Sequence, residues 1–146
     1  MMDNLYLLAR IHGSLVAIAS KNVESVVTVQ DVVPVPQASP SVAGLFALRS
    51  RVLTLIDSQY LITGQSKKAE RGSLAIVAEI AGHPFGLIVE SADDVVSIQA
   101  EQIERSIKPD PVWARFVSET VVIDGQMVMI LNPAAMVGAD DDALAA

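Results

Sequence analysis

Few side chains in this sequence are placed to do chemistry. Asp57 is a possible base, but no Ser, Cys or His stands at a spacing typical of a catalytic pair. His12 and His83 are possible metal ligands, yet the chain has no cysteine and neither histidine has a carboxylate cluster nearby. No glycine-rich loop has the pattern that binds phosphate groups. These residues therefore predict no catalytic site, no metal site and no cofactor.

The same residues have structural roles that explain them more simply. Asp57 and Asn132 each precede a short apolar segment, and Asp and Asn are good N-caps for a helical turn. His12 and His83 each lie beside a glycine and are predicted to be surface residues of two turns. Both pairs therefore indicate the ends of structural elements rather than a site.

The composition favours a folded β protein in a reducing compartment. Hydrophobic residues make up 51% of the chain and aromatic residues only 4%, with β-branched residues abundant. The absence of cysteine excludes disulfides. The N-terminus lacks the pattern of a signal peptide, and no apolar run approaches the roughly 18 residues of a membrane span. We therefore expect a cytoplasmic protein with no direct membrane insertion.

The charge disfavours nucleic acid as a partner. The formal net charge is −7, which repels a phosphate backbone unless a basic patch offsets it. Trp113 is the only tryptophan, so bases would find few aromatic side chains on which to stack. The basic clusters are small: Arg49 with Arg51, and Lys67 and Lys68 with Arg71. A small ligand- or nucleic-acid-binding β-barrel is therefore the less favoured alternative.

Short apolar segments, each ended by a turn signal, recur along the chain. Pairs of such segments joined by two or a few residues are typical of β-hairpins, and Asp124-Gly125 is the strongest turn signal. The predicted hairpins pair 5–11 with 15–19, 45–48 with 52–56, 74–80 with 85–89, and 117–123 with 127–131. A further strand is expected at 95–98, and helical turns at 58–62, 101–105 and 133–137.

The two halves of the chain resemble each other. Ile11 and Ile80 lie 69 positions apart, and each begins a similar turn; at the same offset Val26 matches Val95. A second offset of 75 relates Asp57 to Asn132. The change of offset predicts a longer insertion in the second half, near residues 108–111.

This repeat predicts a mainly β fold. We expect two small, pseudo-repeated, five-stranded β-barrels of the SH3 or OB kind, which share a hydrophobic seam and carry short helical turns. A five- to six-stranded sandwich is the alternative. Residues 1–138 are predicted to form a single domain, with halves at roughly 11–64 and 74–138. The acidic tail at 139–146 is expected to fray.

The sequence resembles a known family, that of CheW. Residues 44–57, GLFALRSRVLTLID, are similar to its signature, in which a Gly-led strand carries Asn-Leu-Arg-Gly and an apolar strand ends in Ile-Asp. Residues 77–98 and 123–131 resemble its second-half strands and last hairpin. Ala47 and Ser50 depart from the signature, whereas Arg49 is retained. Because Ser50 corresponds to Gly125 in the repeat, this turn is expected to differ in shape.

The resemblance implies two linked β-barrels and no enzymatic activity. It also implies a scaffold that couples the cytoplasmic tips of methyl-accepting chemoreceptors to the regulatory domain of a CheA-like histidine kinase, in chemotaxis signal transduction. That kinase domain has a related fold, and the two alternate in rings. A chemosensory pathway with an output other than motility is the alternative, since Ala47 and Ser50 could change the partner.

The resemblance also implies a receptor-binding site. Arg49, predicted at a hairpin turn, is expected to bind the receptor, although without the resemblance a solvated turn charge would be favoured. Four small apolar residues are expected to line the seam between the halves: Val23, Val26, Ala92 and Val95. They form either a groove for an amphipathic helix or plain core, and the sequence favours neither.

Overall fold

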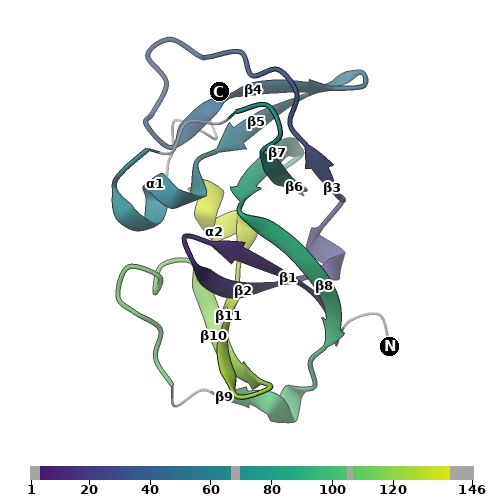
Figure 1. Ribbon diagram of the computed structural model, residues 1–146, viewed down its shortest axis with the longest axis vertical. Helices are drawn as coiled ribbons and strands as arrows, with labels where there is room; N and C mark the ends of the chain where they lie inside the picture. Colours follow the sequence, from purple (N-terminus) through teal and green to yellow (C-terminus); the bar gives the residue numbers. More distant parts are fainter. Residues whose placement is uncertain (1–3, 67–69, 105–106, 139–146) are drawn as a thin grey trace.

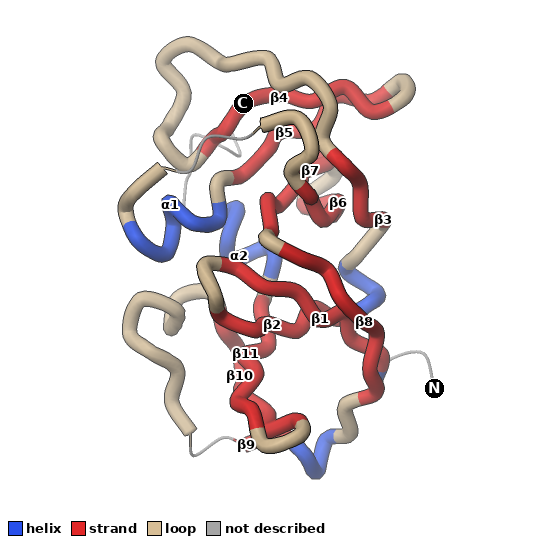
Figure 2. The backbone as a smooth tube through the Cα atoms, viewed as in Figure 1, coloured by secondary structure: helices blue, strands red, loops and turns tan. Residues whose placement is uncertain are grey.

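The structure, a computed structural model, describes residues 4–66, 70–104 and 107–138, and most of its regular secondary structure is β-strand (Figures 1 and 2). The strands are β1 (Leu5–Ile11), β2 (Ser14–Ala19), β3 (Ser25–Thr28), β4 (Val42–Leu48), β5 (Arg51–Ile56), β6 (Leu74–Ile80), β7 (His83–Val89), β8 (Ser91–Ser97), β9 (Ile103–Glu104), β10 (Val117–Ile123) and β11 (Gln126–Leu131). The helices are α1 (Ser58–Thr63), α2 (Pro133–Gly138) and the 3-10 turns η2 (Ser20–Asn22) and η3 (Ala100–Gln102).

The strands form two sheets, and each sheet takes strands from both halves of the chain. One sheet has six strands in the order β8-β1-β2-β11-β10-β9, and the other has five in the order β3-β6-β7-β5-β4. The mainly β fold is thus confirmed, but the ladders do not close into barrels and one sheet has a sixth strand. Neither half contains a complete sheet, so we infer that the two halves fold as one unit.

The internal repeat reproduces the strand bounds. Shifting β1 and the start of β2 by 69 positions gives β6 and the start of β7, and shifting β4, β5 and α1 by 75 gives β10, β11 and α2. The additional elements η3 and β9 precede the predicted insertion at 108–111. The helical turn expected at 101–105 is confirmed only at its start, because the chain forms the 3-10 turn η3 and then pairs Ile103 with Val121. Residues 105–106, like the predicted tail at 139–146, lie outside the described residues.

The four hairpin turns are of two kinds. His12 and Gly13 both have positive φ (48° and 79°), as do the corresponding residues of the β6–β7 and β10–β11 turns. Positive φ at both central residues is the pattern of a type I′ turn. At the β4–β5 turn Arg49 has φ 59° but Ser50 does not have a positive φ. The turn therefore differs as expected, and Ser50 avoids the conformation that Gly125 adopts.

Among the described residues, three apolar clusters hold the sheets together. The largest lies between the two sheets and draws on both, with Val16 and Ile18 from one sheet and Leu87 from the other. The remaining two clusters lie on the faces of the sheets that point away from the largest cluster, one on each sheet. Ala17, between Val16 and Ile18, points into one of these smaller clusters, as alternation along a strand requires. The predicted hydrophobic seam is the largest of the three clusters.

Each helix begins at the predicted cap. The Asp57 carboxylate accepts a hydrogen bond from the Tyr60 N–H (3.0 Å) and another from the Ser66 hydroxyl (3.0 Å). Asn132 similarly accepts from the Ala134 N–H (3.1 Å). Ser58, the first residue of α1, is fully buried, and its hydroxyl bonds to no residue that the structure describes. Its counterpart in the repeat is Pro133, which has no hydroxyl.

Ser58→Ala is expected to raise the free energy of unfolding by about 1 kcal/mol, because a buried hydroxyl without a partner costs about 1–3 kcal/mol. Ser66→Ala is the matched control, since that hydroxyl does bond to Asp57, and it is expected to lower stability by about 1 kcal/mol. Urea unfolding of both variants measures the two changes. A Ser58→Ala variant less stable than the wild type would contradict this account of the helix start.

Candidate protein-interaction site

The four predicted seam residues lie on or beside β3 and β8, which are edge strands of the two sheets. Val23 and Ala92 are half-buried and pack against the cluster between the sheets. Val26 and Val95 are 40% and 52% exposed. The four residues are therefore partly buried and partly exposed, as expected of a shallow apolar surface along the sheet edges.

Strand pairing shows which way the exposed valines face. Val26 pairs with Ile76, and Val95 pairs with Leu7. Directly opposed residues of an antiparallel pair lie on the same face of a sheet. Both partners belong to the cluster between the sheets. Val26 and Val95 therefore extend the seam outward, beyond the point where the opposite sheet covers it.

Arg49 is exposed at the tip of the β4–β5 hairpin, beside the exposed Ala47. Its guanidinium makes no ion pair or hydrogen bond with any residue in the described ranges. Figure 1 places this hairpin at one end of the molecule. Arg49 is thus available to an incoming acidic group and contributes little to the packing of its own sheet.

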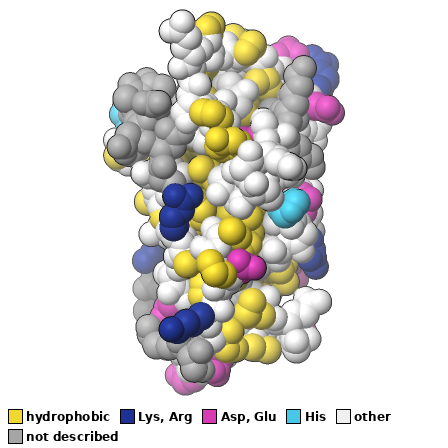
Figure 3. Space-filling view, turned by 90° about the vertical axis from the view of Figure 1, so that its left-hand side faces the viewer, with side chains coloured by type: hydrophobic (Ala, Val, Ile, Leu, Met, Phe, Trp, Pro, Cys, Tyr) yellow, Lys and Arg dark blue, Asp and Glu magenta, His cyan; other side chains and the backbone are white. Residues whose placement is uncertain are grey.

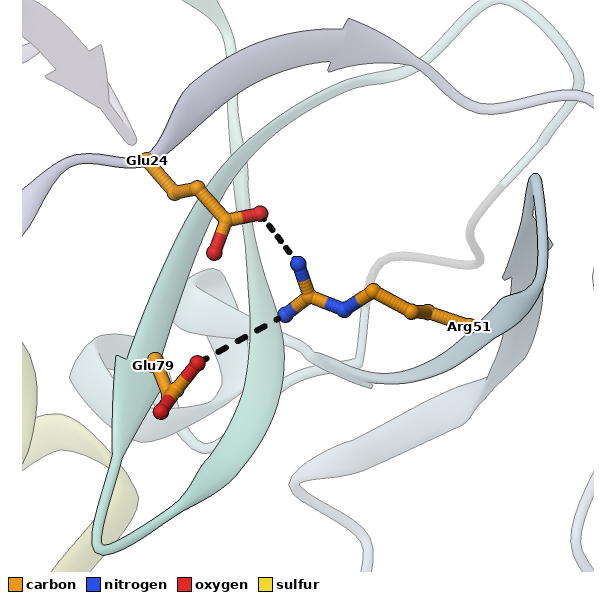
Figure 4. A network of polar contacts seen from close by, with 3 residues as sticks. All are labelled: Glu24, Arg51 and Glu79. Carbon is orange, nitrogen blue, oxygen red and sulfur yellow. Dashed lines mark hydrogen bonds and ion pairs between the residues drawn. The ribbon is translucent and has the colours of Figure 1, made fainter.

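Arg51, two residues further on, is the arginine that the fold brings to the apolar edge. Its guanidinium binds the Glu24 carboxylate at 2.5 Å and lies 3.9 Å from a Glu79 oxygen (Figure 4). Glu24 stands between Val23 and Val26 in the chain. Sequence reasoning missed this network, because its members come from β5, β6 and the residue before β3. The sequence contained one indication of where Arg51 points: alternation along β5 places Arg51 on the same face as the buried Leu53.

Other charged and polar groups have local partners. Arg71 binds Asp31 at 2.7 Å, and this hydrogen bond, reinforced by the opposite charge, raises the pKa of the Arg71 guanidinium. Both side chains are largely exposed, so this ion pair contributes little to stability. Lys67 and Lys68 of the same predicted basic cluster lie outside the described residues.

The residues that could do chemistry are accounted for structurally. His12 and His83 are exposed at two separate turns, and no group of three metal-binding side chains occurs among the described residues. Asp57 is buried and occupied as a helix cap. Within the same described ranges, none of the helices has the length and apolar character to cross a membrane.

Exposed apolar side chains are not confined to the β3 and β8 edges. Figure 3 shows hydrophobic side chains down the middle of one face of the molecule, between scattered basic and acidic groups. In the part of the chain that the structure describes, the large exposed apolar residues are Val26, Val33, Val52, Val95, Val112, Val122 and Met127. Exposure alone therefore does not locate a site, and the seam edge stands out by its continuity with the core.

Two sheets around a shared apolar seam, with part of that seam exposed at the edge strands, define the chain as a small protein-interaction domain. The profile of one family, described as a CheW-like domain, matches residues 5–141, and the chain belongs to this family. The resemblance found in the sequence is thereby confirmed.

Two similar proteins support the assignment. The chain is 25% identical over 104 residues to "Chemotaxis protein CheW" of Rhizobium meliloti, an alignment that covers 68% of this chain and 64% of that protein. It therefore spans less than two thirds of that relative's length. The crystal structure of the scaffolding protein TtCheW from Thermoanaerobacter tengcongensis superposes with a TM-score of 0.81 at 21% identity, covering 94% of this chain and 89% of that one. This likeness confirms the fold.

Proposed function

We propose that this protein is a non-catalytic scaffold that couples the cytoplasmic tips of methyl-accepting chemoreceptors to the regulatory domain of a CheA-like histidine kinase. The match to the CheW-like domain family along residues 5–141 is the observation that carries the proposal. The protein would act in the cytoplasm and reach the membrane only through receptor arrays. Its contribution would be to hold two partners at fixed distance, which needs no catalytic group.

The receptor site comprises Arg49 together with Val23, Val26, Ala92 and Val95. An amphipathic helix buries its apolar face in a hydrophobic groove, and the partly exposed seam edge offers such a surface. The free guanidinium of Arg49 would bind an acidic group on the same partner. Arginine is well suited to this role because its planar fork can bind a carboxylate through two hydrogen bonds.

The shape of the β4–β5 turn supports a second form of this proposal, a chemosensory pathway with an output other than motility. Ala47 and Ser50 replace the Asn and Gly of the family signature, and Ser50 does not adopt the positive φ seen at the other three turns. Because Arg49 is itself in this turn, a different turn shape would change the direction in which its side chain meets a partner. The partners could therefore belong to a chemosensory pathway that controls something other than motility.

The test of this proposal is whether the protein binds a chemoreceptor tip fragment and a CheA-like regulatory domain at the same time. Receptor fragments and kinases from motility and non-motility pathways, compared side by side, distinguish the two forms of the proposal. Binding to neither kind of partner would reject both.

A further inference from the structure

One segment, residues 24–33, joins the two ends of the five-stranded sheet, and we call it the strap. It includes β3, which pairs with β6 at four positions. Its last residue, Val33, forms an isolated bridge with Leu45 of β4, with hydrogen bonds of 2.8 and 2.9 Å in the two directions. Because β6 and β4 lie at opposite ends of the β6-β7-β5-β4 ladder, the strap links two strands that do not pair with each other.

The strap covers part of the apolar cluster on the face of the sheet that points away from the other sheet. Val29 is fully buried in this cluster, and Val27 and Val32 pack against it. The cluster also contains Leu53 of β5. Burial of these side chains favours the closed strap. The strap is nevertheless a short edge segment with few ladder hydrogen bonds, and such segments open locally at a lower free energy than the whole fold.

An ionic clasp fastens the beginning of the strap. Glu24 donates its N–H to the Val77 carbonyl of β6 (2.8 Å), and its carboxylate binds the Arg51 guanidinium at 2.5 Å. Glu79 of β6 lies 3.9 Å from the same guanidinium, so that Arg51 lies between two carboxylates (Figure 4). Arg51 begins β5, which is separated from β3 by β6 and β7 in the ladder. The clasp therefore ties the strap to a strand beyond its ladder partner.

The clasp has the features of an ion pair that contributes measurably. Single exposed ion pairs contribute little, whereas charges arranged in a network contribute more. The Arg51 and Glu24 side chains are 40% and 39% exposed, and Glu79 is the third member. The strap has a second ion pair, between Asp31 and Arg71, but these side chains are 83% and 68% exposed. The Glu24–Arg51–Glu79 clasp is thus the stronger of the two.

The second half of the chain holds the equivalent segment by a different means. Gln126 stands 75 positions after Arg51, and its neutral amide cannot form an ion pair. The strand equivalent to β3 is β8, which has seven residues and pairs with β1 at six positions, compared with four positions for β3. A longer ladder in one half thus corresponds to a shorter ladder with an ionic clasp in the other.

We propose that the Glu24–Arg51–Glu79 clasp is a salt-sensitive fastening, and that residues 24–33 open as a unit while the rest of the sheet stays folded. Salt screens partly exposed charges, with a Debye length of about 10 Å at 0.1 M, but screens neither ladder hydrogen bonds nor apolar contacts in this way. Ionic strength therefore sets the population of the open strap. Opening leaves β6 unpaired on one side, because β3 is its ladder partner there.

Amide hydrogen exchange of the full chain, followed by NMR, measures the opening. The reporters are the Glu24 and Val29 amides, whose hydrogen bonds to Val77 and Ser73 break when the strap opens. The amides of β7, the central strand of the sheet, are the reference. A rise in NaCl from about 20 mM to about 500 mM should speed exchange of the reporters about twofold to fivefold relative to β7. Reporters as protected as β7, or unaffected by salt, would overturn the proposal.

Arg51→Gln tests the clasp itself. It copies Gln126, which the second half carries at the equivalent position, so the fold should be retained, as a thermal melt will check. At low salt the Glu24 and Val29 amides should exchange about twofold to fivefold faster than in the wild type, and most of the salt effect should be lost. The matched control is Arg49→Gln, which removes the same charge from a guanidinium without an ion pair in the described ranges. Equal exchange in the two variants would overturn the proposal.

Glu24→Gln completes a double-variant cycle with Arg51→Gln. If the two side chains act through their contact, the double variant should exchange its strap amides no faster than either single variant. Additive effects of the two substitutions would overturn the clasp. An equal acceleration at β7 in these variants would show a loss of overall stability and would overturn the separate opening of the strap.

Discussion

Gly44→Ala is expected to lower the free energy of unfolding by about 2–4 kcal/mol. Gly44 has φ +146°, which side chains other than glycine rarely adopt, and an added Cβ would lie 2.5 Å from Val32 Cγ1 and 2.9 Å from the Val33 carbonyl oxygen. The carbonyl cannot move freely, because Val33 and Leu45 hydrogen-bond to each other in both directions (2.8 and 2.9 Å). Backbone strain and overpacking each cost about 1–3 kcal/mol.

Gly125→Ala is the matched control for this prediction. Gly125 also has positive φ (+79°), but a Cβ there would meet no atom within 4 Å. Its cost should be limited to the left-handed conformation, about 1–2 kcal/mol. Urea unfolding of both variants measures the difference. Equal losses at the two positions would show that the close approach of Val32 and Val33 to Gly44 adds no cost to the substitution, which would contradict this prediction.

Arg49→Glu is expected to weaken binding of a receptor tip fragment at least about thirtyfold. Charge reversal replaces attraction by repulsion across an acidic partner surface, which for a partly desolvated contact is on the order of 2 kcal/mol or more. Because the Arg49 side chain is exposed and has no partner in the described structure, stability should change by less than about 0.5 kcal/mol. Binding of the kinase regulatory domain should change less than receptor binding.

Arg71→Glu separates a specific contact from the effect of overall charge. It makes the same change in net charge at another exposed arginine, whose partner is Asp31 in a different loop. Titration calorimetry with the receptor fragment should find Arg71→Glu close to the wild type. If Arg49→Glu binds as tightly as the wild type while its thermal melt is unchanged, Arg49 is a solvated turn charge and not part of the receptor site.

Local features of this fold could be predicted from the sequence. The hairpin at 117–123 and 127–131 follows from apolar runs on either side of Asp124-Gly125, since a type I′ turn and its strands are specified by adjacent residues. The helix starts follow in the same way from Asp57 and Asn132. The helical turn expected at 101–105 ends early for a non-local reason, because Ile103 pairs with Val121 in a strand that lies beyond the insertion.

Features that depend on distant strands could not be predicted. The repeat suggested one barrel for each half, whereas β3 and β8 each pair with the first strand of the opposite half. Such pairing brings together residues that are far apart in sequence, which periodicity alone does not specify. The Glu24–Arg51–Glu79 network depends on the same exchange. The fold brings Arg51 to Glu24, the residue after Val23, whereas Arg49 has no ion pair within the described ranges.

The central claim, that this protein couples two partners, is tested most directly by a three-component assembly. The full chain, a chemoreceptor tip fragment and a CheA-like regulatory domain are mixed in equal amounts and analysed by size-exclusion chromatography with light scattering. We predict one species containing all three components, which loses only the receptor fragment when the chain carries Arg49→Glu. The claim is contradicted if the receptor fragment and the kinase domain displace each other, or if neither one binds the protein.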